Sequence, residues 1–133
     1  MEPKIFYNET DGEVIQLDGR RVTWLLKAAA ADTKYTSVCL VAYEPGRRAK
    51  PSHSHPYGEE TIYILSGTGK AKVGDQISKI EPGMLVRFPQ GIQHMLWNTG
   101  DVDLVAVCFY APNAEAIDYQ FDADFDFPEF MIT

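Results

Sequence analysis

Short stretches rich in β-branched and aromatic residues recur through the middle of the chain. They are TSVCLVAY (36–43), TIYILSG (61–67), GKAKVG (69–74), MLVRF (84–88), HMLWN (94–98) and LVAVCFYA (104–111). Turn-forming sequences such as EPG, SGTG and PQG separate them. Short apolar stretches about ten residues apart, punctuated by glycine and proline, predict the strands of an antiparallel sandwich or barrel.

The two ends of the chain differ from this central pattern. The sequence GEVIQLDGRRVTWLLK (12–27) predicts one or two further strands that turn at Asp18-Gly19. The tail alternates phenylalanine with aspartate, which is typical of an extended arm that packs its rings on the barrel. That arm either covers its own barrel or crosses to a second subunit. We expect one domain, with N-terminal strands and a connection in 1–34, the barrel in 35–112 and the arm in 113–133.

The formal net charge of -7 is concentrated in the tail. Residues 113–133 hold six of the 19 acidic residues and none of the 12 basic ones, which leaves 13 acids and 12 bases in residues 1–112. A nearly neutral barrel lacks the basic surface that nucleic-acid binding requires, so we expect no nucleic-acid partner.

The apolar stretches and the first residues bear on where the protein works. Every apolar stretch is far shorter than the roughly 20 residues of a membrane-spanning helix, and the start of the chain does not resemble a secretion signal. We therefore expect a cytoplasmic protein that is not attached to a membrane. In a reducing compartment its two cysteines, Cys39 and Cys108, would be unpaired.

The stretch PSHSHPYGEE (51–60) carries the strongest chemical signal. Residues two apart in an extended chain point to the same side, so His53 and His55 can direct two imidazoles at one point. Two imidazoles and a nearby carboxylate form a site for a first-row transition metal. The pair alone is also compatible with a proton-transfer site or a polar loop.

The residues around this pair resemble the two sequence motifs of the cupins. Downstream of His53 and His55, Glu60 is followed by six residues and Gly67. Farther along, Gly83 is followed by five residues and then PQGIQHMLWN, which matches the second motif at Pro89, Gly91, His94 and Asn98. One position departs from the first motif: six residues lie between Gly46 and His53, where five are usual. The extra residue falls in a loop, which tolerates insertion.

The resemblance implies a fold, a set of metal ligands and an assembly. The fold is an all-β, antiparallel jelly-roll barrel, also called a double-stranded β-helix, and the assembly is a homodimer. The ligands of one divalent transition metal (Fe, Mn, Ni, Zn or Cu) would be His53, His55, Glu60 and His94. All three histidines of the chain are therefore at ligand positions. The remaining motif residues would shape turns: Gly67, Gly83, Pro89, Gly91 and Asn98.

The alternation of side chains along the strands predicts which residues surround the metal. The apolar candidates are Ile62, Ile64, Met84, Phe88, Leu96 and Phe109 or Tyr110. The polar candidates near the mouth are Tyr43, Arg47, Arg48, Lys50, Tyr57 and Gln93. The basic cluster Arg47, Arg48 and Lys50 is either a solvated loop or a group that attracts anions. Tyr57 and Gln93 are the candidates for a catalytic role, and Tyr57 is also compatible with a packing role.

Three functions are compatible with these residues. The first is a metalloenzyme acting on a small organic acid or oxygenated metabolite, with dioxygenase, decarboxylase, isomerase or lyase chemistry. The alternative is a sensor that binds a small, anionic ligand without turnover. A metal-free sugar epimerase is less compatible, because such enzymes lack the full set of four ligands. Fold and metal alone do not decide among the reactions.

Overall fold

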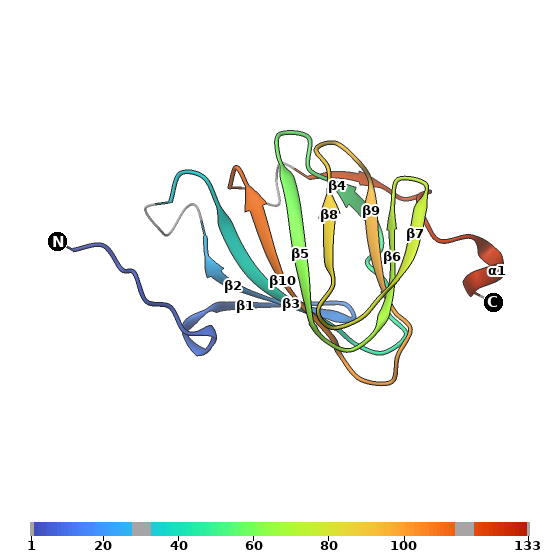
Figure 1. Ribbon diagram of the computed structural model, residues 1–133, viewed down its shortest axis with the longest axis horizontal. Coiled ribbons are helices and arrows are strands. Elements are labelled where there is room, and N and C mark those ends of the chain that lie inside the picture. Colours follow the sequence, from blue (N-terminus) through green and yellow to red (C-terminus); the bar gives the residue numbers. More distant parts are fainter. Residues whose placement is uncertain (1, 28–32, 114–118, 133) are drawn as a thin grey trace.

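The computed structural model describes residues 2–27, 33–113 and 119–132. Two antiparallel sheets face each other, as expected for a jelly roll (Figure 1). In spatial order the six-stranded sheet holds β1 (Glu13–Leu17), β2 (Arg20–Leu26), β3 (Ser37–Tyr43), β10 (Leu104–Ala111), β5 (Glu59–Ser66) and β8 (Leu85–Phe88). The five-stranded sheet holds β11 (Gln120–Asp122), β4 (Ser52–Ser54), β9 (His94–Asn98), β6 (Gly69–Val73) and β7 (Gln76–Ile80). A 3-10 turn, η1 (Glu9–Asp11), and a short helix, α1 (Glu129–Ile132), lie near the two ends.

The space between the sheets is filled by every second residue of the strands. On β10 the residues Leu104, Ala106, Cys108 and Tyr110 are buried, while those between them are more exposed. This period of two is the one expected for a sheet with one face on the core. Cys108 lies directly opposite Cys39 on β3, and both thiols are free.

The predicted strands agree closely with the central strands of the structure, but β4, β7 and β11 were not among them. The strands β4 and β11 have three residues each, too few to show an alternation. They nevertheless pair with each other and place His53 beside Phe121.

The turn residues of the motifs connect the strands that carry the site. Gly67 has a φ of 79°, and a β-carbon there would collide with the backbone of Asp103, so only glycine fits. The amide of Gly91 donates to the carbonyl of His55 at 2.9 Å. Asn98 is fully buried and donates to the carbonyls of Tyr43 and Val102, both at 2.8 Å. These turns therefore fix the strand ends on either side of the metal-ligand candidates.

The described part of the C-terminal arm packs on its own barrel. The strand β11 extends the five-stranded sheet, and Phe127, which is 3% exposed, lies against Trp97 with ring centroids 5.2 Å apart. The carboxylate of Asp126 accepts two hydrogen bonds from Arg48, at 2.7 and 3.0 Å, and lies 3.1 Å from the ammonium of Lys50. The sequence left two interpretations of the basic cluster, a solvated loop or a group that attracts anionic ligands. Neither describes Arg48 and Lys50, because both side chains bind Asp126 of the arm.

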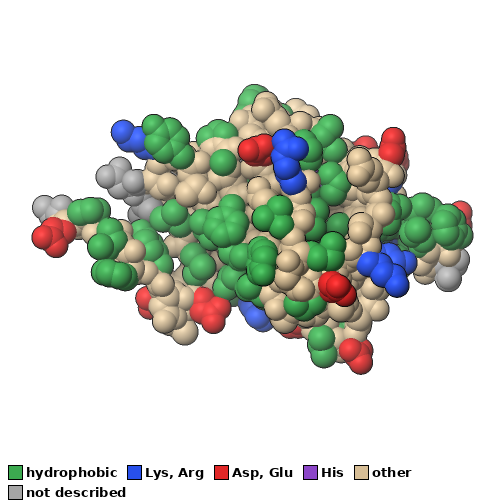
Figure 2. Space-filling model, viewed as in Figure 1, with side chains coloured by type: hydrophobic (Ala, Val, Ile, Leu, Met, Phe, Trp, Pro, Cys, Tyr) green, Lys and Arg blue, Asp and Glu red, His purple; other side chains and the backbone are tan. Residues whose placement is uncertain are grey.

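The N-terminal segment 2–12 projects from the other side of the molecule (Figure 1). Its apolar side chains are exposed, with Ile5 at 68% and Phe6 at 84%. Figure 2 shows hydrophobic side chains on this projecting segment and again at the C-terminal end. Among the residues that the structure describes, none belongs to a helix that is both long and apolar enough to cross a bilayer.

Candidate metal centre

Four side chains from both sheets meet at one point between them. His53 on β4 is paired with His94 on β9, and His55 follows two residues later on the same side of the chain. Glu60 reaches the same point from β5 in the opposite sheet. One possible ligand atom from each of the four lies within 4.8 Å of the others. The structure therefore brings together residues 53, 55, 60 and 94, as the sequence resemblance implied.

The hydrogen bonds of the histidines leave nitrogen atoms turned inward without partners. His55 Nε2 lies 2.9 Å from Glu60 Oε1. His94 Nδ1 donates to the carbonyl of Ile92 at 3.1 Å, which leaves the lone pair of its Nε2 directed at the cluster. His94 Nε2, His53 Nδ1 and His55 Nδ1 are buried and have no hydrogen-bond partner among the described residues. Buried nitrogens without partners are costly, and a bound cation would satisfy them.

The protonation states in the cluster suit metal binding. Burial, together with the neighbouring His94, lowers the pKa of His53 to about 3, so this imidazole is neutral at neutral pH. Burial would raise the pKa of Glu60, but the hydrogen bond with His55 and the nearby imidazole of His94, whose Nε2 lies 3.4 Å from Oε1, outweigh it and hold the pKa well below its usual range. A neutral imidazole and an ionised carboxylate are the forms that bind metals.

The donor set fits one divalent transition-metal ion. Two donors on opposite sides of an ion, each at about 2.1 Å, are about 4.2 Å apart, close to the 4.8 Å span of the cluster. Three imidazoles and one carboxylate suit first-row transition metals more than Mg²⁺ or Ca²⁺. With one carboxylate as the only charged donor, a bound divalent ion would keep a net charge of +1.

Aromatic rings enclose the cluster on two sides. Phe88 stacks on His94, with centroids 3.9 Å apart and planes 5° apart. Tyr119 stacks on His53 at 4.8 Å and 14°, and its edge contacts His55 at 4.4 Å. Burial raises the pKa of Tyr119, so its phenol keeps its proton at neutral pH. These rings hold the imidazoles in place and keep water away from them.

Tyr119 was missed in the sequence because the arm was interpreted only through its phenylalanines. The one available signal was its position. It is the only tyrosine of the arm and lies two residues before the first phenylalanine, Phe121. Its distance in sequence from the motifs gave no reason to place it at the metal centre.

Three residues of the cluster, His53, Glu60 and His94, line a cavity of about 330 Å³ between the two sheets. Of the predicted lining residues, Tyr43, Phe88, Leu96 and Tyr110 line this cavity. Ile62 and Ile64 are on the same side of β5 as Glu60, but both are fully buried in the hydrophobic core and do not reach the cavity.

Three other predicted lining residues also lie elsewhere. Met84 packs against the core. Phe109 is 44% exposed because Cys108 and Tyr110 take the inward positions of β10. Arg47 is exposed and forms an ion pair with Asp18 on the outside of the barrel.

Neither candidate for a catalytic role lines the cavity. Tyr57 is 73% exposed in the loop between His55 and Glu60. Gln93 connects β4 to the arm: it accepts from Ser52 at 2.7 Å and donates to the carbonyl of Gln120 at 3.2 Å. Its position next to His94 in the sequence made it a candidate, but its side chain points to the other face of the sheet.

One side of the cavity is formed by β2, whose residues were not among the predicted lining residues. Arg20, Val22 and Trp24 line it, and their spacing of two is the alternation of a strand with one inward face. The signal was therefore present in RRVTWLL. It was overlooked because the resemblance concerned residues farther along the chain.

Comparisons with known proteins place this chain in a family. The family model for the cupin domain matches residues 39–110. Protein SchB of Streptomyces halstedii is 31% identical over 86 residues, which cover 65% of this chain and 60% of SchB. The chain thus spans less than two thirds of the length of that relative.

Solved structures agree on the fold. Pac13 of Streptomyces, a nucleoside dehydratase, has a TM-score of 0.74 at 17% identity, over 90% of this chain and 92% of Pac13. Oxalate decarboxylase of Lactobacillus farciminis, solved with formate, has a TM-score of 0.75 at 19% identity, over 84% of this chain and 34% of the other. The family match extends over more than half of the residues and includes all four clustered side chains. This chain belongs to the cupin family.

Proposed function

We propose that this protein is an enzyme that uses a divalent transition-metal ion to act on a small organic acid or a related oxygenated metabolite. The observation that carries the proposal is the buried cluster of three imidazoles and one carboxylate at a cavity. A purely structural cluster would not need a cavity beside it. Metal sites that bind substrates keep open positions next to such a space.

When bound, a divalent ion supplies a Lewis acid that polarises an oxygen atom of the substrate. The chain's own residues do the rest. His53, His55, His94 and Glu60 hold the ion, and the carbonyl of Ile92 fixes the ring of His94 in the tautomer that exposes Nε2. Tyr119, beside His53, keeps a proton on its phenol oxygen at the edge of the site.

Two proteins with similar structures support the proposed class of substrate, and they do not identify the substrate itself. One is a nucleoside dehydratase and another is an oxalate decarboxylase. Both act on small oxygen-rich molecules, and each shares only the fold with this chain. We therefore propose the substrate class and leave the reaction type to experiment.

The test is metal content followed by turnover. Protein purified without added metal is analysed for bound ions, reconstituted with each candidate metal, and incubated with a panel of small organic acids under air and under nitrogen. We expect metal-dependent consumption of one acid, which Glu60→Gln abolishes. Metal and ligand binding without any product would instead indicate a sensor. Protein without metal affinity would contradict the proposal.

A further inference from the structure

The cavity contains one side chain whose charge the metal centre does not use. Arg20 begins β2 and lines the cavity, and it is the only cationic residue among the described lining residues. We propose that Arg20 binds a carboxylate at the part of the cavity away from the metal centre. The substrate would then be an extended organic acid, with oxygen donors at one end and a carboxylate at the other. This inference rests on the proposed function and names its substrate class.

Arg20 lacks the acidic partner that other arginines of the chain have. Its Nη1 donates only a long hydrogen bond, 3.4 Å, to the phenol oxygen of Tyr43, and its guanidinium lies 5.9 Å from that ring. Three of the four arginines outside the cavity are paired with carboxylates: Arg47 with Asp18, Arg48 with Asp126 and Arg87 with Glu59. No ion pair between Arg20 and an acid occurs within the described ranges. A guanidinium with unused donors in an apolar cavity favours an anionic ligand.

The strand register separates Arg20 from the metal centre. Arg20 is paired with Tyr43 at one end of β3. Glu60 is paired with Tyr110, which is paired with Ser37 at the other end of β3. At about 3.3 Å per residue, the six residues from Ser37 to Tyr43 place the backbone of Arg20 about 20 Å from the level of Glu60 along the strand direction.

The long side chain of Arg20 shortens this separation without closing it. Arg20 and His53 both line the cavity, so the guanidinium faces the same space as the metal centre. No hydrogen bond or ion pair joins Arg20 to His53, His55, Glu60 or His94 in the described structure. A ligand that contacts both the guanidinium and the metal centre must cross this space, which favours an acid longer than a two-carbon diacid.

The lining between the two charged ends is apolar. Val22, Trp24 and Leu96 are the side chains there, and Trp24 lies 5.8 Å from the ring of Tyr110. The body of the ligand is therefore aliphatic or aromatic. One guanidinium balances one negative charge, which favours a carboxylate over a doubly charged phosphate. A cavity of about 330 Å³ is of the size that binds small metabolites.

The experiment uses the full chain loaded with Zn²⁺ and two probes that differ only in charge. Caffeate has a catechol that can chelate the metal and a carboxylate at its far end, and its methyl ester lacks that charge. Binding is measured by titration calorimetry, with oxalate as a short acid. The variants are Arg20→Met, Arg20→Lys and, as the matched control, Arg21→Met. Arg21 is the adjacent arginine, and it is exposed on the outer face of β2.

We expect the wild type to bind caffeate about 10- to 100-fold more tightly than the ester, the range of a charge-assisted hydrogen bond pair. Arg20→Met removes this preference and leaves ester binding unchanged, Arg20→Lys keeps part of it, and Arg21→Met keeps all of it. Equal binding of acid and ester by the wild type, binding of neither, or equal loss of both in Arg20→Met overturns the inference.

The zinc content separates this inference from the proposed function. A wild type that retains Zn²⁺ but shows no preference for the acid overturns only the role of Arg20. A wild type that retains no Zn²⁺ overturns the proposed function, and the inference with it. Because the preference is measured first in the wild type, the test does not depend on the folding of any variant.

Discussion

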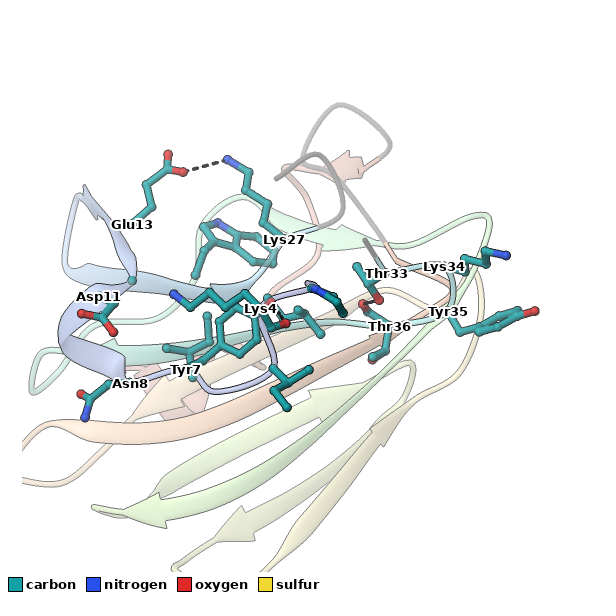
Figure 3. Close-up of a pocket in the computed structure, with 16 residues that line it drawn as sticks. Lys4, Tyr7, Asn8, Asp11, Glu13, Lys27, Thr33, Lys34, Tyr35 and Thr36 are labelled. Carbon is teal, nitrogen blue, oxygen red and sulfur yellow. Dashed lines mark hydrogen bonds and ion pairs between the residues drawn. The ribbon is translucent and has the colours of Figure 1, made fainter. Parts of the chain in front are cut away.

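Two cavities of this molecule differ in size and in chemistry, although a chain end forms part of the wall of each. The larger, about 800 Å³, lies between the N-terminal segment and residues 33–36 (Figure 3). The smaller, about 330 Å³, holds the metal-ligand candidates and has Tyr119 and Phe121 of the C-terminal arm in its wall. Among the described lining residues, Trp24 alone is shared between the two cavities.

The ionisable groups of the two cavities are arranged in different ways. In the larger cavity Glu13 pairs with Lys27 at 3.2 Å at the exposed rim, and Lys34 points away into solvent (Figure 3). In the smaller one four donors converge on one buried point. The comparison teaches that convergent, buried donors distinguish the candidate functional cavity, and that volume does not.

Replacing one acidic residue in each cavity is expected to give the largest difference between the two cavities, and that difference is in metal affinity. Glu60→Gln keeps the shape of the side chain but removes the only charged ligand, so we expect metal affinity to fall by at least about 100-fold. Asp11→Asn, the matched change in the larger cavity, leaves the affinity unchanged. Metal content after dialysis measures both. Equal metal content in the two variants would remove the distinction between the cavities.

A second pair of variants compares how firmly the two chain ends are attached. Phe127 is buried against Trp97, and Phe127→Ala is expected to lower the free energy of unfolding by about 3 kcal/mol. Phe6 is 84% exposed, and Phe6→Ala is expected to change it by less than about 0.5 kcal/mol. Urea denaturation measures both values. Similar losses would show that the N-terminal segment is packed in solution.

The part of the cavity wall formed by the C-terminal arm is expected to increase the metal affinity of the site. Tyr119→Ala removes the ring that stacks on His53, and we expect a loss of about tenfold in metal affinity, the lower end for residues that orient ligands. Tyr119→Phe keeps the ring and should keep the affinity. A competitive chelator titration measures both. An unchanged affinity in Tyr119→Ala would mean that the arm covers the site without supporting it.

The ion pairs between Asp126 and the barrel are expected to make a smaller contribution to the free energy of unfolding, and this contribution depends on pH. Burial would raise the pKa of Asp126, but hydrogen bonds from Arg48 and Lys50 and from the backbone amide of Phe127 lower it to about 2. Because this pKa is depressed in the folded state, the pairs stabilise the protein above the ordinary value of 3.8 and are lost as the pH falls toward 2.

The measurement is the stability of the wild type minus that of Asp126→Asn at a series of pH values. We expect a difference of about 1 kcal/mol at pH 5 that shrinks to near zero at pH 2. Subtracting the variant cancels the titration of the other acids in the tail. A difference that grows on acidification would contradict the assigned partners of Asp126.

The fold and the metal cluster were accessible from the sequence for a physical reason. Strands alternate strictly, and the motifs record the turns and donors that close the barrel, so His53, His55, Glu60 and His94 are identified without coordinates. The cavity was only partly accessible. Which of Phe109 and Tyr110 faces inward depends on a register that an unbroken apolar stretch does not reveal.

Residues outside the motifs were the hardest to assign. Arg20 and Tyr119 reach the cavity from the two ends of the chain, through pairings that no local pattern encodes. Conversely, Arg48 and Lys50 precede the ligands in sequence but bind the arm on the outer surface. The homodimer remains a prediction, and the exposed N-terminal segment is the natural place to look for its interface.

Anomalous diffraction from crystals of the metal-loaded protein, recorded at the absorption edge of the bound element, tests the central claim most directly. We predict a single peak about 2.0 to 2.2 Å from one nitrogen of each of His53, His55 and His94 and from a carboxylate oxygen of Glu60. A peak at any other position, or an imidazole of His94 beyond coordination distance, would contradict it.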